Sequence, residues 1–142
     1  MEKINLALIA SGGGTDARAV MDAYLAGFIP NVNLVSLIST KEGAGCLEKA
    51  GKRGVENTTI VCQNGKDQAE LKNFNQKLRS YLDNKKIDLV FLVGCIVKIF
   101  PVPGVDIYNI HPADPVKHGG NGMYGLLVHK RVIQEVEDTI SR

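Results

Sequence analysis

The chain has 142 residues and a mass of 15.4 kDa, with 44% hydrophobic and 23% charged residues. This length and composition fit one soluble globular domain and exclude two. The 17 Lys and Arg residues exceed the 15 Asp and Glu residues by two and are dispersed, which excludes a broad basic surface for nucleic acid or for a membrane.

Short apolar runs alternate with longer segments of mixed polarity, and this alternation predicts βαβ units around a parallel sheet. We therefore expect an α/β fold, namely a Rossmann-like, open, mostly parallel sheet with helices on both faces. The expected strands are Ile4–Ala10, Val32–Ser39, Asn57–Cys62, Leu89–Val93 and Val105–Ile110. The expected helices are Thr15–Leu25, Ala44–Arg53, Asp67–Leu82 and Tyr124–Val136.

Ligands of open parallel sheets bind outside the carboxyl ends of the strands. Chemistry is therefore expected in three segments that follow strands: Ser11–Asp16, Gly94–Phe100 and Asn109–Gly122.

The N-terminus and the cysteines favour a protein of the reducing cytoplasm. Cys46, Cys62 and Cys95 lie far apart and show no CxxC spacing, which fits neither a disulfide framework nor a zinc site. The first apolar run is interrupted by Asn5 and leads into three glycines, so we interpret it as a buried strand and not as a signal peptide. No stretch approaches the roughly 18 apolar residues that a membrane span needs.

The segment Ser11–Asp16 places three consecutive glycines between a predicted strand and the start of a predicted helix. Backbone N–H groups and the helix dipole favour an anion there, such as a phosphate. A tight turn in which Thr15 or Asp16 caps the helix is a second interpretation, compatible with the first. Ala17 stands where a dinucleotide-binding motif has its last glycine, and no lysine follows as in a P-loop. The segment thus predicts a site for a single small phosphate.

Asn109 and His111 are two apart on a predicted strand, so their side chains point to the same face at its carboxyl edge, with Ile110 turned into the core. Pro112 biases His111 towards an extended backbone. An Asn amide and a His that titrates near neutrality suit acyl transfer, in which an oxyanion forms and protons move. The alternative is that both side chains only bind the following loop.

Other polar residues are expected to play lesser parts. His118 and His129 show no metal-ligand spacing with His111, so we predict no metal site. Cys95 is expected to pack and not to act as a nucleophile, and Tyr108 is expected to pack away from the side of His111.

The glycine segment after the first strand, the apolar strand ending at Gly94, and Asn109-Ile110-His111-Pro112 with the glycine-bearing loop after it together resemble the folate-dependent formyltransferases. The likeness extends over about residues 4–133. The residues after the glycine segment, Ala17-Arg18-Ala19-Val20-Met21-Asp22-Ala23, are closer to the members that formylate glycinamide ribonucleotide than to those that act on methionyl-tRNA.

This resemblance implies transfer of a formyl group from 10-formyltetrahydrofolate, the cosubstrate, to the amine of glycinamide ribonucleotide in purine biosynthesis. It assigns the substrate phosphate to Gly14, Thr15 and Asp16. It assigns folate binding to Ile96, Val97, Lys98, Ile99 and Asn109, and catalysis to Asn109 and His111. Lys98 is the one charge in an apolar span, where it could touch the glutamate tail of a folate or equally be solvated.

The chain departs from the family in two places. It has Pro112-Ala113-Asp114-Pro115-Val116 where the family usually has Pro-Ser-Leu-Leu-Pro. The family also has a catalytic Asp that pairs with the His and raises its pKa, and no such position occurs before Arg142. We therefore expect residues 1–142 to be a single N-terminal formyltransferase domain that ends before the last strands and helix.

Two other functions remain open, the first from the residues alone and the second from the resemblance. One is a phosphosugar- or nucleotide-binding module without catalysis, which would use only the glycine segment. The other is formylation of methionyl-tRNA, which the lack of a basic run disfavours.

Overall fold

The computed structural model describes residues 3–110, which form five strands and three helices. The strands are β1 (Ile4–Ala10), β2 (Val32–Ser39), β3 (Asn57–Thr59), β4 (Leu89–Leu92) and β5 (Asp106–Asn109). The helices are α1 (Thr15–Leu25), α2 (Gly45–Lys52) and α3 (Gln68–Asn84). The bounds of β1, α1 and β2 coincide with those predicted from the sequence.

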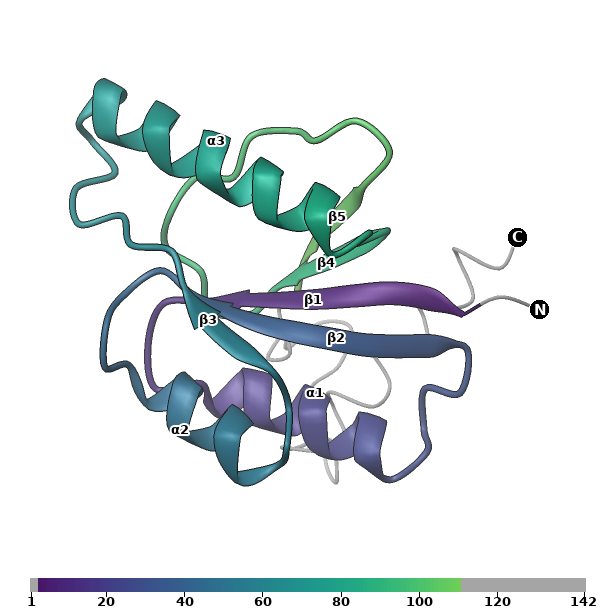
Figure 1. The fold of residues 1–142 in the computed structure, drawn as a ribbon. Coiled ribbons are helices and arrows are strands. Elements are labelled where there is room, and N and C mark those ends of the chain that lie inside the picture. The colour runs from purple at the N-terminus through teal and green to yellow at the C-terminus, as the bar shows by residue number, and fades with distance from the viewer. Residues whose placement is uncertain (1–2, 111–142) are drawn as a thin grey trace, which may run out of the picture.

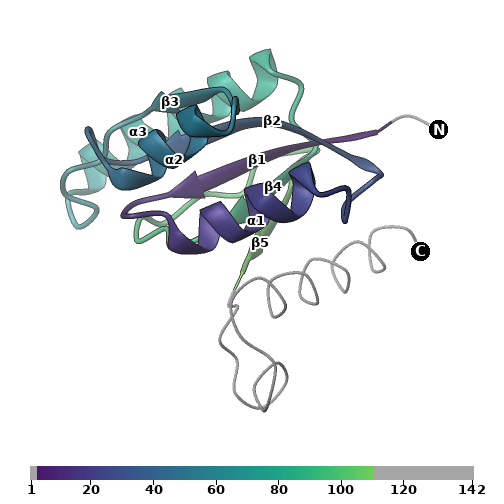
Figure 2. The same ribbon diagram turned by 90° about the horizontal axis from the view of Figure 1, so that it is seen from below.

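All neighbouring strands are parallel, and their order across the sheet is β3-β2-β1-β4-β5. Helices α1 and α2 cover one face of the sheet and α3 covers the other, as Figures 1 and 2 show. The predicted open parallel sheet with helices on both faces is thus confirmed. The chain proceeds to one side of β1 through β2 and β3, and then crosses to its other side at β4. This reversal creates a topological switch point between β1 and β4.

Strand β1 lies between two hydrophobic cores because its successive side chains point to opposite faces. Leu6 and Leu8 pack with α1 and α2, whereas Ala7 and Ile9 pack with α3. A strand buried on both faces has a nearly continuous apolar sequence. This explains why a short apolar run, without alternation, predicted β1 correctly.

The ends of several elements differ from the prediction by a few residues. Strand β3 is shorter than predicted because its ladder pairs only with Leu37–Ser39, although Cys62 N–H still donates to the carbonyl of Thr40 at 3.1 Å. Asp67 is the N-cap of α3, and its carboxylate accepts hydrogen bonds from the N–H groups of Ala69 and Glu70. The predicted helix over residues 124–136 lies outside the described residues. No helix within residues 3–110 is both long and apolar enough to span a bilayer.

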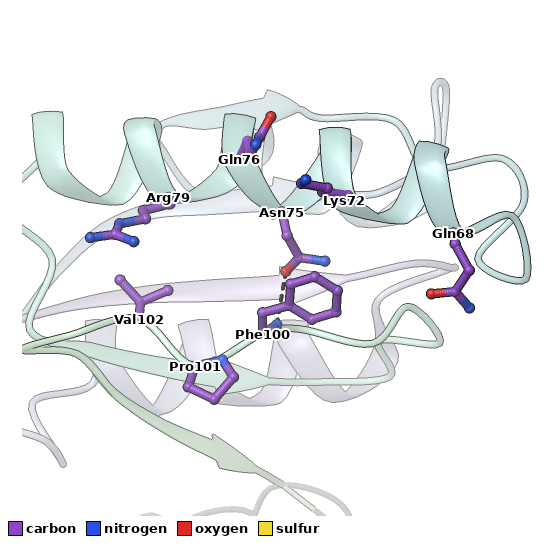
Figure 3. A pocket seen from close by; sticks show the side chains of 8 residues that line it. All are labelled: Gln68, Lys72, Asn75, Gln76, Arg79, Phe100, Pro101 and Val102. Atoms are coloured by element: carbon purple, nitrogen blue, oxygen red, sulfur yellow. Dashed lines mark hydrogen bonds between the residues drawn. The ribbon is translucent and has the colours of Figure 1, made fainter.

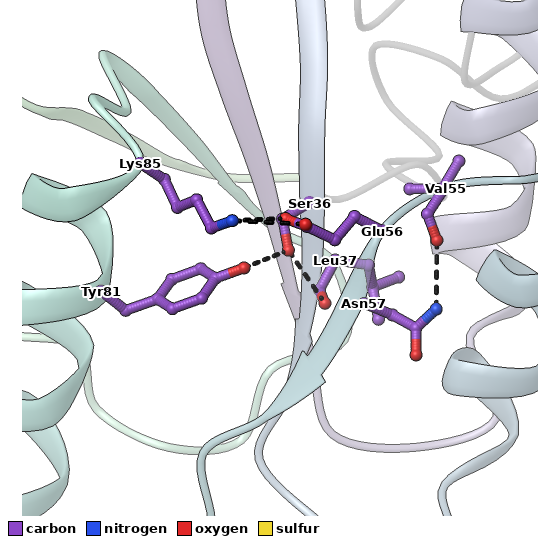
Figure 4. Close-up of polar contacts among 7 residues, drawn as sticks. All are labelled: Ser36, Leu37, Val55, Glu56, Asn57, Tyr81 and Lys85. Atoms are coloured by element: carbon purple, nitrogen blue, oxygen red, sulfur yellow. Dashed lines mark hydrogen bonds and ion pairs between the residues drawn. The ribbon is translucent and has the colours of Figure 1, made fainter.

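Polar contacts fix the C-terminal part of α3 on its face of the sheet (Figure 4). The hydroxyl of Tyr81 lies 2.7 Å from that of Ser36, a fully buried residue of β2. The Lys85 ammonium pairs with Glu56, just before β3, at 3.1 Å. These contacts hold the C-terminal part of α3 in place, and its middle contacts the segment after β4 through Asn75.

Candidate active site at the carboxyl edge of the sheet

The loops after β1 and β4 meet at the switch point between these strands. The N–H of Ser11 donates to the carbonyl of Gly94 at 3.2 Å, and the N–H of Ile96 donates to the Ser11 hydroxyl at 3.0 Å. Two of the three segments predicted to carry chemistry are therefore in direct contact.

Ser11 also joins the loop that follows β2. Its hydroxyl lies 2.7 Å from the hydroxyl of Thr40, and only 2% of Ser11 is exposed. One buried side chain thus links the ends of three adjacent strands. The sequence analysis did not single out Ser11 and Thr40, although a hydroxyl residue directly after each of two apolar strands is a signal that could have found them.

The glycine segment, Ser11–Asp16, packs closely against the first turn of α2. Gly14 has a φ of +78°, and a Cβ atom there would lie 2.5 Å from the Cβ of Cys46 and 2.7 Å from its Cα. The N–H of Cys46 donates to the carbonyl of Gly12 at 3.2 Å. Glycine is therefore required at position 14 both for its backbone conformation and for the close approach of α2.

Gly14 is the N-cap of α1, and no side chain caps this position. The interpretation in which Thr15 or Asp16 is the capping residue is therefore wrong. Both residues lie in the first turn of the helix, where Thr15 is exposed and Asp16 is half-buried. The helix thus begins at a glycine, which has no side chain that could compete with an anion for the N–H groups of the first turn.

The segment assigned to folate alternates between outward and inward residues. Ile96 is 74% exposed and Lys98 is exposed, whereas Val97 and Ile99 pack in the core beneath α3. Only Ile96 and Lys98 therefore present side chains outward, and Val97 and Ile99 hold the segment to the sheet.

Asn75 of α3 clamps the far end of this segment. Its amide nitrogen donates to the carbonyl of Lys98 at 3.1 Å and to that of Leu71 at 3.0 Å, and its amide oxygen accepts from the N–H of Phe100 at 2.8 Å (Figure 3). Asn75 is 7% exposed, so these three bonds satisfy a buried amide. The sequence analysis missed this residue, although an Asn within the apolar face of a helix is a recognisable signal.

A cavity of about 430 Å³ lies between α3 and the segment at Phe100–Val102. None of the predicted site residues lines it. Figure 3 shows Asn75 and Phe100 at this cavity, with Lys72 and Arg79 of α3 on either side along the helix. The cavity therefore lies next to the hydrogen bonds of Asn75 and not at the glycine segment.

Cys95 is half-buried, and its thiol donates to the carbonyl of Val97 at 3.4 Å. Burial raises the pKa of this thiol above its ordinary value. A nucleophilic cysteine needs the opposite shift, so the geometry agrees with a packing role.

Strand β5 places Asn109 opposite Leu92 of β4, at the carboxyl edge of the sheet. Asn109 is exposed, whereas Ile110 is buried and Tyr108 packs against the same core. The predicted inward direction of Ile110 is thus confirmed, and Tyr108 packs away from the side of Asn109. His111, the loop after it, His118 and His129 lie outside the described residues.

Acidic, histidine and cysteine side chains do not gather in this part of the protein. Within residues 3–110, no three His, Cys, Asp or Glu side chains come together as metal ligands.

Comparison with known proteins shows what this chain is similar to. The family model of the formyl transferases matches residues 4–140. The chain is 32% identical over 134 residues to the chloroplastic phosphoribosylglycinamide formyltransferase of Arabidopsis thaliana, covering 91% of this chain and 44% of that protein. It is 29% identical over 163 residues to the phosphoribosylglycinamide formyltransferase of Dictyostelium discoideum, covering 94% of this chain and 78% of that protein.

The fold is also similar to a crystal structure of phosphoribosylglycinamide formyltransferase from Brucella melitensis, with a TM-score of 0.66 and 27% identity. That match covers 95% of this chain and 68% of the other. The chain thus spans less than half the length of the plant relative and about two thirds of the bacterial one. With nearly all of its length matched by the family model, the chain belongs to the formyl transferase family.

Proposed function

We propose that the protein transfers a formyl group from 10-formyltetrahydrofolate to the amine of glycinamide ribonucleotide in purine biosynthesis. The relatives that bear the name of this activity support the proposal. The observation that carries it is the contact of Ser11 with Gly94 and Ile96, because it brings the glycine segment and the segment after β4 together. A transferase must hold donor and acceptor side by side, and holding them so contributes much of its rate.

In this proposal the acceptor phosphate binds at Gly14, Thr15 and Asp16, where the N–H groups of the first turn of α1 and its dipole favour an anion. Glycines upstream of the helix allow the phosphate to approach the backbone closely.

The formyl donor lies along the segment after β4. Ile96 and Lys98 contact it with their side chains, and Val97 and Ile99 contribute their backbone, since their side chains are turned inward. Asn109 lies at the same edge of the sheet, on the strand next to β4.

The reaction is an acyl transfer. The amine nitrogen of the acceptor attacks the formyl carbon, and the carbonyl electron pair moves to the oxygen. The Asn109 amide donates a hydrogen bond to this oxyanion. When the oxyanion collapses, the bond between the formyl carbon and the donor nitrogen breaks, and His111 carries a proton from the attacking amine towards the leaving nitrogen.

Formyl transfer by the full-length protein, followed with a radiolabelled donor, tests these roles. Asn109→Ala and His111→Ala are each expected to lower kcat by about 100-fold or more, the loss usual for an oxyanion donor or a general acid–base group. Asp106→Ala is the control, because Asp106 is exposed at the opposite end of β5. Losses below about tenfold in both variants would refute the assigned roles.

Thermal-shift titration separates this function from a phosphosugar-binding module without catalysis. A ligand that binds only the native state raises the melting temperature. We expect shifts with both glycinamide ribonucleotide and a folate. A shift with the phosphosugar alone, without turnover, would favour the binding module, and turnover with methionyl-tRNA as acceptor would favour the other formyltransferase activity.

We also infer that the protein works in the cytoplasm. The support is that Cys46, Cys62 and Cys95 are free thiols, as a reducing compartment keeps them. Cell fractionation with an antibody to the protein tests this inference, and recovery in an oxidising compartment would contradict it.

A further inference from the structure

We propose that Lys49 of α2 is a further binding residue for the acceptor, and that its ammonium group pairs with the phosphate at the glycine segment. This inference rests on the proposed function, because it identifies another contact of the same phosphate site. The ammonium of Lys49 donates a hydrogen bond to the carbonyl of Gly13, so its positive charge already lies at the glycine segment.

Helix α2, which carries Lys49, is attached to its surroundings at both of its ends. The guanidinium of Arg53 donates to the backbone carbonyl of Lys49 at 3.0 Å and pairs with Asp22 of α1 at 2.6 Å. At the start of α2, the N–H of Cys46 donates to the carbonyl of Gly12 at 3.2 Å. The helix that carries Lys49 is therefore attached to α1 and to the glycine segment, and the lysine is half-buried.

The charge on Lys49 is not used in an ion pair within residues 3–110. Glu48, its neighbour in α2, pairs instead with Lys52 at 3.0 Å. An ammonium group has three N–H donors, and the contact with Gly13 uses one of them. Two donors therefore remain for a ligand at this edge.

A cation at the glycine segment would also offset electrostatic repulsion there. Asp16 lies in the first turn of α1, where its carboxylate repels any other negative charge that comes close. A phosphate monoester beside Asp16 would be attracted by the helix dipole and repelled by the carboxylate. The Lys49 ammonium offsets this repulsion and adds charge-assisted hydrogen bonds. Lys49 thus makes the site selective for a phosphorylated acceptor.

Three variants test the proposal in the full-length protein. Lys49→Met removes the charge but keeps a long side chain that suits a helix, Lys49→Arg retains the charge, and Lys52→Met is the matched control one turn further on. Lys52 is exposed, and its partner is Glu48 and not the glycine segment. We expect Lys49→Met to raise KM for glycinamide ribonucleotide by about 10- to 100-fold, as for loss of a hydrogen bond to a charged group. KM for the formyl donor should change by less than about twofold.

Lys49→Arg should restore most of the acceptor affinity, and Lys52→Met should behave as wild type. An unchanged KM for the acceptor in Lys49→Met would overturn the proposal. Equal increases in KM for both substrates, with a lower melting temperature, would also overturn it, because they would show that Lys49 only supports the loop.

Binding of ribose 5-phosphate provides a test that is independent of turnover. Calorimetric titration should show that wild type binds it more tightly than ribose, and that Lys49→Met loses this preference. If the full-length protein binds ribose 5-phosphate through Lys49 but transfers no formyl group, the proposed function fails and the phosphate contact stands. If it transfers the formyl group and Lys49→Met keeps the preference, the function stands and the contact fails.

Discussion

Replacing Gly14 with alanine tests how closely the glycine segment packs against α2. An L-residue at a φ of +78° pays about 1–2 kcal/mol for the left-handed conformation. The new methyl group would also lie 2.5 Å from the Cβ of Cys46, which is far inside van der Waals contact and involves backbone as well as side chain. Overpacking of this kind costs about 1–3 kcal/mol. The sum, about 2–5 kcal/mol, is a large part of the stability of a domain.

Gly27 provides the matched control. Its φ is +83°, but a Cβ atom there would meet nothing within 4 Å. Gly27→Ala therefore pays only the conformational cost, and both variants gain equally from the reduced entropy of the unfolded chain. The difference between the two variants isolates the contact with Cys46.

Urea unfolding of the wild type and both variants measures this difference. We expect Gly14→Ala to lose about 1–3 kcal/mol more in free energy of unfolding than Gly27→Ala. The m-values should be equal, since the surface exposed on unfolding does not change. Losses that agree within about 0.5 kcal/mol would refute the close packing of the glycine segment on α2.

Three further predictions concern the segment after β4. Asn75→Ala leaves the half-buried carbonyl of Lys98 without its donor and the N–H of Phe100 without its acceptor, so unfolding measurements should show a loss of about 1–3 kcal/mol, and KM should rise for the formyl donor more than for the acceptor. Ser11→Ala removes the hydroxyl that accepts from the N–H of Ile96 and contacts Thr40, and both substrates should then show a raised KM in steady-state kinetics. Because burial raises the pKa of Cys95, less of it is thiolate at pH 8 than of an ordinary cysteine, and iodoacetamide should alkylate it more slowly in the native than in the unfolded protein. Unchanged values in any of these assays would contradict the contact concerned.

Local patterns of the sequence were sufficient for the class of fold and for most of its elements. The apolar run of β1, the helical spacing in α1 and the run of β2 each depend on residues close together in the chain, and their predicted bounds agree with the structure. The glycines marked the strand ends, and the carboxyl edge of a parallel sheet then indicated where chemistry should lie. The outward direction of Asn109 followed from the two-residue period of a strand.

Contacts between distant residues could not be predicted in this way. The order β3-β2-β1-β4-β5 depends on which strands become neighbours, and no local pattern carries that information. The bond between Ile96 and Ser11 spans 85 residues, that between Lys49 and Gly13 spans 36, and that between Phe100 and Asn75 spans 25. Each side chain has an ordinary role in its own helix or loop. These side chains belong to the site only because the sheet and its covering helices bring separate segments to one edge. Buried polar groups at that edge then form hydrogen bonds with one another.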